Sequence, residues 1–215
     1  MRTLRAVAEI AVVSTALGLC GCRAPAQNVR APDFTLTDSK GETVKLSDFK
    51  GKIVVLEWTN PDCPFVQRHY KAGTMVALAK RYEPKGVAWL AINTTYYMDR
   101  AKDAQWAQKN QLPYPILGDH AGTVARLYSA KSSPHMFIID AAGKLVYQGG
   151  IDNDPAGDMK EGRVNYVAQA LDELLAGKPV SVPETKPYGC SVKFPPEGLP
   201  AGLPALRPEG RVEGK

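Results

Sequence analysis

Apolar and polar positions along the first half of the chain predict strands that alternate with helices. From Ala31 to Lys52 the sequence alternates around "DSKG", which is typical of a β-hairpin with a short loop. The unbroken apolar run Ile53–Trp58 predicts a strand in the buried centre of a sheet. Apolar residues at helical spacing predict a helix over Pro64–Tyr82. A strand is then expected over Gly86–Asn93, followed by a helix over Asp99–Asn110. This order favours parallel strands joined by helical crossovers.

The second half of the chain predicts a hairpin, a closing helix and an extended C-terminal part. Two apolar runs flank Ala141–Lys144, which indicates a second hairpin, and Arg163–Leu175 forms an amphipathic helix that a glycine and a proline end. We therefore expect one α/β domain over residues 31–178, an arm over 179–193, and a tail rich in proline and glycine over 194–215 that does not pack.

Composition narrows the class of protein without naming a function. Hydrophobic residues make up 44% of the chain and charged residues 23%, which is typical of a globular domain. The net charge of +5 comes from Lys and Arg residues that are scattered along the chain. This distribution argues against a nucleic-acid-binding surface.

The N-terminus has the pattern of an export signal. Two arginines within the first five residues precede the uncharged stretch Ile10–Cys22, which is shorter than the roughly 20 residues of a membrane span. Residues 1–22 are therefore predicted to be a removable signal peptide, with a single-span anchor extending across Glu9 as the alternative.

The end of this segment, "LCGC", resembles the lipoprotein box of bacteria, which would make Cys22 the lipidated first residue of the mature chain. Arg23 follows, as in lipoproteins sorted to the outer membrane. We expect a periplasmic or envelope protein that a lipid attaches to the membrane, or a freely soluble product if the signal is simply cleaved. Cys63 and Cys190 then remain in the folded domain, in a compartment where disulfides persist.

Cys63 lies where the apolar strand gives way to a helix, in "TNPDCPFVQRHY". Backbone N–H groups at a helix start carry partial positive charge and can stabilise a thiolate, whereas the neighbouring Asp62 opposes a second negative charge. Cys63 is thus a candidate redox nucleophile. The alternative is a small buried structural cysteine.

Three stretches of the chain resemble one known family. "APDFTLTDSKGETVKLSDFKGK", "WTNPDCPFV" and "SSPHMFIIDAAGKLVYQGG" occur in the order found in the redoxin branch of the thioredoxin-like fold, the AhpC/TSA (peroxiredoxin-like) family. The resemblance implies a central mixed β-sheet flanked by helices, with an N-terminal hairpin and a C-terminal arm. It implies a thiol-dependent oxidoreductase without a cofactor, in which Cys63 attacks a peroxide or a disulfide, and it places Pro134 at the cis-proline that holds substrate backbone.

The resemblance also implies a second cysteine, which in thioredoxin-like reductants comes three residues after the first. Val66 occupies that position, so Cys190 is the candidate resolving cysteine, acting within its own chain or on a partner in a homodimer. An unidentified thiol reductant would complete the cycle. The alternatives are a permanent disulfide that pins the arm, or no pairing at all.

Residues around Cys63 depart from the peroxidase pattern of the family. Asn60 stands where peroxidases carry a Thr or Ser, with Thr59 one residue earlier, and His135 stands in place of their activating arginine. These departures weaken the case for a peroxidase, and Pro134 followed by a strand matches thiol-disulfide oxidoreductases better, so both a peroxide and a disulfide stay open as the substrate. His135 would exchange protons with Cys63 or else be a half-exposed loop residue. Glu57 would be a buried proton acceptor or else reach solvent at the strand end.

Two other readings of these residues remain open. A thioredoxin-fold copper carrier could use Cys63, Cys190 and His135 as ligands, and a non-catalytic binding module would need none of them. His69 lies six residues after Cys63, about 240° around a helix, so we expect it at the surface or facing a partner.

Overall fold

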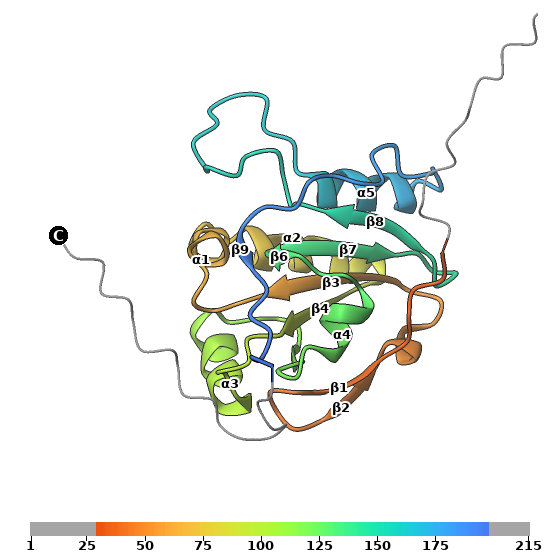
Figure 1. Ribbon diagram of the computed structural model, residues 1–215. Helices are drawn as coiled ribbons and strands as arrows, with labels where there is room; N and C mark the ends of the chain where they lie inside the picture. Colours follow the sequence, from red (N-terminus) through yellow and green to blue (C-terminus); the bar gives the residue numbers. More distant parts are fainter. Residues whose placement is uncertain (1–28, 198–215) are drawn as a thin grey trace, which may run out of the picture.

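The computed structural model describes residues 29–197, so the predicted signal peptide with Cys22 lies outside the described residues, as does the chain from residue 198. A seven-stranded sheet runs through the centre in the order β2-β1-β5-β4-β3-β7-β8 (Figure 1). Its strands are β1 (Thr35–Asp38), β2 (Thr43–Lys45), β3 (Ile53–Thr59), β4 (Val87–Asn93), β5 (Ile116–Gly118), β7 (His135–Ile139) and β8 (Leu145–Gly149).

The sheet is mixed, as the sequence predicts. Strands β3, β4 and β5 run parallel, whereas β7 and β8 form an antiparallel hairpin against the other side of β3, and β1 and β2 form the N-terminal hairpin beside β5. Residues Val54–Thr59 of β3 are all buried because helices cover both faces of the sheet.

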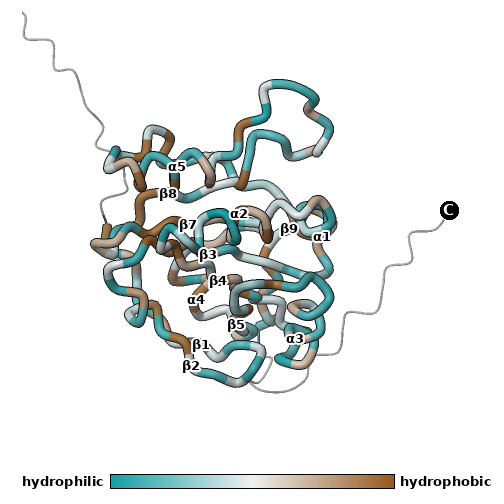
Figure 2. The backbone as a smooth tube through the Cα atoms, turned by 180° about the vertical axis from the view of Figure 1, so that it is seen from behind, coloured by the Kyte–Doolittle hydropathy of each residue, from teal (hydrophilic) through white to brown (hydrophobic). Residues whose placement is uncertain are grey.

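Helices enclose the sheet on both sides. The elements are η1 (Leu46–Phe49), α1 (Pro64–Lys71), α2 (Thr74–Tyr82), η2 (Glu83–Lys85), α3 (Arg100–Lys109), α4 (Thr123–Leu127) and α5 (Tyr166–Leu175). Buried side chains of α1, α2, α3 and α5 form one core cluster, and those of α4 and the N-terminal hairpin region form another on the opposite face. Figure 2 shows the apolar backbone segments gathered inside and the hydrophilic loops outside.

Two predicted helices have different bounds in the structure. The helix expected over Pro64–Tyr82 is two helices, because Gly73 adopts a left-handed conformation with φ of 71° between α1 and α2. The closing helix begins at Tyr166 rather than Arg163, since the side chain of Asn165 caps it by accepting from the N–H of Ala168.

The C-terminal arm crosses the molecule as an extended strap. The arm first adds to the outer edge of β8, where Thr185 N–H donates to the carbonyl of Gln148 and Gln148 N–H donates to the carbonyl of Pro183. It then pairs through β9 (Cys190–Ser191) with the short strand β6 (Ser132–Ser133). In Figure 1 it passes in front of the ends of α1 and β3. Phe194, which we expected in an unpacked tail, packs against α4 with the Arg126 guanidinium 4.7 Å from its ring centroid.

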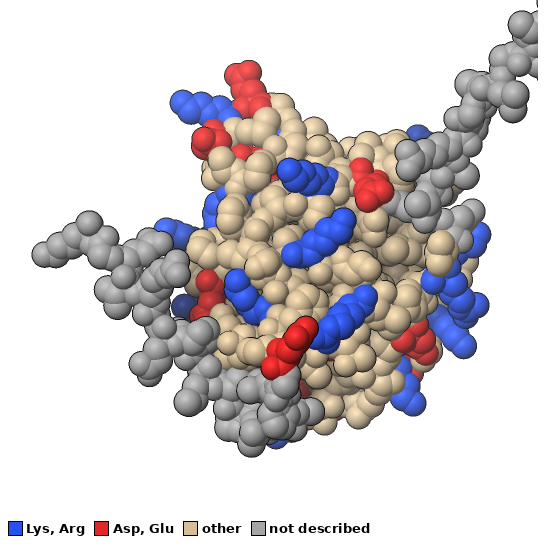
Figure 3. Space-filling model, viewed as in Figure 1, with Lys and Arg blue, Asp and Glu red and all other residues tan. Residues whose placement is uncertain are grey.

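Charged side chains are dispersed on the face that the arm crosses. Figure 3 shows Lys and Arg side chains separated from one another by uncharged surface on that face. Within residues 29–197, no helix combines the length and the apolar character that crossing a membrane requires.

Candidate thiol-disulfide site

A tight turn places Cys63 at the first position before a helix. The side-chain oxygen of Asn60 accepts from the N–H of Asp62 at 2.9 Å, and its carbonyl accepts from the N–H of Cys63 at 3.0 Å. Cys63 is the N-cap of α1, followed by Pro64, and only 1% of its surface is exposed. Asn60 therefore shapes the turn that carries the thiol.

The thiol of Cys63 faces the loop that contains Pro134. Cys63 Sγ donates to the carbonyl oxygen of Ser133 at 3.0 Å, and the Ser133–Pro134 peptide bond is cis, as the resemblance implies. The site thus lies between the start of α1 and the start of β7.

The arm brings Cys190 to the same place. In the antiparallel β6–β9 ladder, Cys190 is the residue opposite Ser133. The Cys190 thiol lies close enough to Cys63 for that cysteine to shift its pKa, and both cysteines are free. Burial, the hydrogen bond to Cys63 and the charge of Cys63 raise the pKa of Cys190 to about 11. The structure therefore brings together, within one chain, the two cysteines that the sequence singles out.

Glu57 is fully buried rather than open to solvent. Its carboxylate accepts from Tyr70 Oη at 2.8 Å and Trp89 Nε1 at 2.9 Å, with Tyr114 Oη at 3.4 Å. Burial raises its pKa to about 7, although these hydrogen bonds act in the opposite direction. Tyr70 follows Cys63 by two helical turns on the same helix and belongs to the same core cluster, so the carboxyl group lies on the Cys63 face of the sheet.

His135 and Thr59 are both buried, but their side chains lie on different faces of the central sheet. The ring of His135 lies 4.3 Å from the ring of Phe137, in the cluster on the face away from Cys63, and its Nδ1 accepts from the N–H of Lys131. Burial and the charge of Lys131 lower its pKa to about 3, so the imidazole is neutral at physiological pH. His135 is thus neither a half-exposed loop residue nor directed at the thiols, whereas the hydroxyl of Thr59 is buried without a hydrogen-bond partner among the described residues.

His69 is buried, in contrast to the expectation of a surface position. The arm covers it, because Tyr188 Oη lies 2.9 Å from His69 Nε2. The same hydroxyl donates to Asp152, which Arg163 holds at 2.9 Å. Burial lowers the pKa of His69 to about 4. Sequence reasoning missed this cluster; the one signal was the tyrosine and glycine that directly precede Cys190.

The structure gives no support to metal carriage. Among residues 29–197, no three His, Cys, Asp or Glu side chains gather in an arrangement that could hold a metal ion. His135, the third ligand in the copper-carrier reading, packs on the opposite face from Cys63.

A buried thiol at the strand-to-helix junction, opposite a cis-proline loop in a mixed sheet, defines a thioredoxin-like thiol protein. A model of the AhpC/TSA family matches residues 28–148, more than half of the chain, and the chain belongs to this family.

Individual proteins are similar to this chain over half of its length or more. The thiol-disulfide oxidoreductase ResA of Bacillus thuringiensis subsp. konkukian is 29% identical over 118 residues, a match that covers 55% of this chain and 66% of that protein. The crystal structure of an uncharacterized conserved protein from Geobacillus kaustophilus superposes with a TM-score of 0.72 and 32% identity, covering 79% of this chain and 93% of that one. The thioredoxin domain of a thiol-disulfide oxidoreductase from Bacteroides vulgatus has a TM-score of 0.50 at 23% identity, covers 58% of this chain and 89% of that one, and shows the fold alone.

Proposed function

We propose that this chain is a thiol-disulfide oxidoreductase in which Cys63 is the nucleophile and Cys190 resolves the mixed disulfide. The contact between the two thiols beside the cis-proline loop carries the proposal. The similarity to a relative named thiol-disulfide oxidoreductase supports the same class of reaction.

The reaction has two exchange steps. The Cys63 thiolate attacks one sulfur of a substrate disulfide, so that a mixed disulfide forms and the other substrate sulfur leaves as a thiolate. Cys190 then gives its proton to the thiolate that left the substrate and attacks Cys63 Sγ, so that the second substrate sulfur leaves as a thiolate. The substrate gains two electrons, the cysteine pair becomes a disulfide, and a thiol reductant restores it. Because Cys190 reaches Cys63 within one chain, resolution needs no second copy.

Glu57 supports proton movement in this scheme. With a pKa of about 7, its carboxyl group can both accept and release a proton near neutral pH. Tyr70, on the helix that begins after Cys63, donates to the Glu57 carboxylate. The proposed exchange reaction uses no cofactor.

The surroundings of Cys63 favour a disulfide over a peroxide as the substrate. Asn60 uses its side-chain oxygen to form the turn instead of offering a hydroxyl group to a peroxide. The guanidinium of Arg68, on the same helix as Cys63, donates to the carbonyls of Asp154 and Pro155, so these N–H groups are not offered to a peroxide. An extended protein segment is the natural ligand of a loop that already pairs with a strand.

The same proposal includes export. The apolar segment Ile10–Cys22 supports secretion to the envelope, with lipidation at Cys22. Substituting Cys22→Ser is expected to move the protein from the membrane fraction to the soluble fraction of the producing cells. A protein that stays in the membrane fraction would contradict lipid anchoring at this cysteine.

The decisive experiment compares two oxidants on one protein. The full chain with Cys20→Ser and Cys22→Ser, which leaves Cys63 and Cys190 as its thiols, is reduced and mixed with insulin or with hydrogen peroxide. Acid quenching, alkylation and intact mass then follow the Cys63–Cys190 disulfide over time. We expect it to form faster with insulin than with equimolar peroxide, and the opposite order would establish a peroxidase.

Two variants assign the roles of the cysteines. Cys63→Ser should abolish reaction with either oxidant. Cys190→Ser should leave the first step and accumulate a mixed disulfide between Cys63 and an insulin chain. Unchanged turnover in the second variant would remove Cys190 from the mechanism.

A further inference from the structure

The arm adds a short strand beside the residues that lead into the cis-proline loop. Ser132 and Ser133, directly before the cis-proline, pair antiparallel with Ser191 and Cys190. A short strand added to this edge is the way in which an extended peptide binds by backbone hydrogen bonds. The arm is therefore a peptide ligand that remains attached to its own receptor.

Glycine is the residue that the structure accepts at position 189. Gly189 has a φ of 127°, and a Cβ built there would lie 2.0 Å from the carbonyl oxygen of Ser133 and 2.7 Å from its carbonyl carbon. This oxygen also accepts from Cys63 Sγ. Any larger residue at 189 would displace either the arm or the backbone group that Cys63 contacts.

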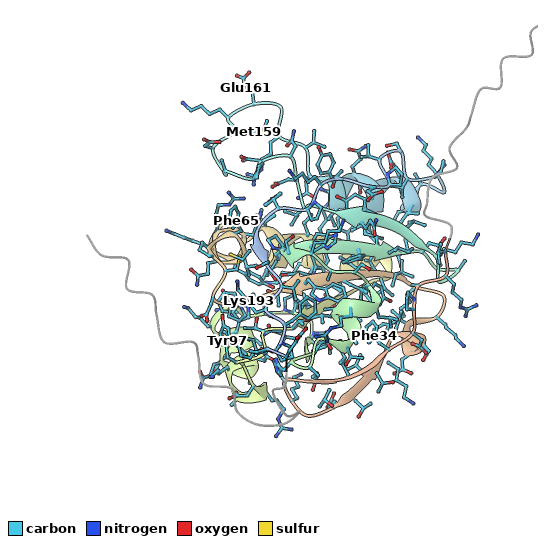
Figure 4. The ribbon with its side chains drawn as sticks, viewed as in Figure 1. Phe34, Phe65, Tyr97, Met159, Glu161 and Lys193 are labelled. Carbon is cyan, nitrogen blue, oxygen red and sulfur yellow. The ribbon has the colours of Figure 1, made fainter. Side chains whose placement is uncertain are left out.

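The side chain of Tyr188 anchors the segment two residues before Cys190. Its hydroxyl lies 2.9 Å from His69 Nε2 and donates to Asp152, and its ring lies 6.1 Å from the ring of Phe65. Arg68 adds a guanidinium 6.0 Å from the ring centroid. In Figure 4, Phe65 lies beside the arm at the start of α1, and Lys193 lies farther along the arm.

We propose that Tyr188 and Gly189 are positioning residues that set the register of the arm on β6, so that this edge beside Cys63 selects a cysteine preceded by glycine and, one residue earlier, by tyrosine. This inference rests on the proposed exchange reaction and adds its recognition rule. Neither residue touches the reacting sulfur atoms; both act by holding Cys190 at Cys63.

The test measures how strongly the arm favours the intramolecular disulfide. Reduced full-length protein with Cys20→Ser and Cys22→Ser is equilibrated in mixtures of reduced and oxidised glutathione. The reaction converts two protein thiols and one oxidised glutathione into the Cys63–Cys190 disulfide and two reduced glutathiones. Alkylation and intact mass give the equilibrium constant.

Gly189→Ala and Tyr188→Ala are each expected to lower this constant at least tenfold, which corresponds to about 30 mV for this two-electron couple. Tyr188→Phe, which keeps the ring and removes the hydroxyl, should fall between wild type and Tyr188→Ala. The matched control is Gly143→Ala, because Gly143 also has a positive φ of 81° but nothing within 4 Å of an added Cβ. The control should stay within twofold of wild type.

The outcomes of these measurements distinguish a failure of the positioning role from a failure of the proposed exchange reaction. Wild-type constants in both Gly189→Ala and Tyr188→Ala would overturn the positioning role while leaving the exchange reaction intact. Glutathionylation of Cys63 in the Cys190→Ser background tests the exchange chemistry alone, and its absence would overturn the proposed function. Far-UV circular dichroism of the reduced variants, matching wild type, shows that a lowered constant does not come from unfolding.

Discussion

The burial of Glu57 predicts how strongly the unfolding free energy of the protein depends on pH. The carboxyl group is fully buried, and its pKa is raised from 4.5 to about 7. Folding therefore favours the protonated form, and the stability that this contributes is complete below pH 4.5 and is lost as the pH rises through about 7. A difference of this size corresponds to about 3 kcal/mol of unfolding free energy. Glu57→Gln removes the ionisation and retains a side chain of similar shape.

The assay is urea unfolding followed by tryptophan fluorescence, with both proteins kept reduced by a phosphine, at pH values from 4.5 to 8.5. The stability of wild type minus that of Glu57→Gln should fall by about 3 kcal/mol, steadily between pH 4.5 and about 7, and should level off above the folded-state pKa. Subtracting the variant cancels the titration of the other groups. A difference that does not depend on pH would refute the claim that Glu57 changes charge near neutrality.

Two further predictions concern the missing local partner of Cys63 and the ion pair between His120 and Asp103. Val66→Cys in the Cys190→Ser background should restore turnover of insulin reduction, because residue 66 is one helical turn after Cys63 and its side chain is buried; turnover no higher than that of the background would contradict this. Burial lowers the pKa of His120, but the hydrogen bond and charge of Asp103 outweigh burial and raise it. The charged pair therefore stabilises the fold below the ordinary histidine pKa and is lost as the pH rises through the raised one. Asp103→Asn should lower the urea midpoint more at pH 6 than at pH 9, and an equal loss at both values would argue against the pair.

Much of the fold could be predicted because its signals are local. Alternation around "DSKG" and the apolar run of β3 come directly from side-chain period, and both are confirmed. The break at Gly73 was missed because apolar residues continue at helical spacing across it. The left-handed backbone conformation of Gly73 sets the boundary between α1 and α2, and the hydrophobic pattern carries little information about the conformation of a glycine.

The candidate site was only partly visible in the sequence. Cys63 could be located by its junction, and Pro134 and Cys190 by resemblance to the family. The positions of His69 and His135 depend on contacts across the fold: the arm covers His69, and the strand register turns His135 toward Phe137. Such contacts join residues far apart in sequence, and two-residue strands such as β6 and β9 leave almost no periodic signal.

Because Cys63 and Cys190 lie far apart in the sequence, contacts outside the helix that follows Cys63 can set the stability of the disulfide between them. When a partner cysteine lies one turn away, the helix itself fixes how close the two sulfur atoms are. Here Cys190 is held by contacts along the arm, including Thr185, whose hydroxyl lies 2.7 Å from Tyr147 Oη and accepts from the N–H of Gly150 at 3.0 Å. Each anchor raises the effective concentration of Cys190 at Cys63. Substitutions outside the thiol site can therefore tune the disulfide without altering the nucleophile, and loosening the arm exposes the edge of β6 to an external peptide.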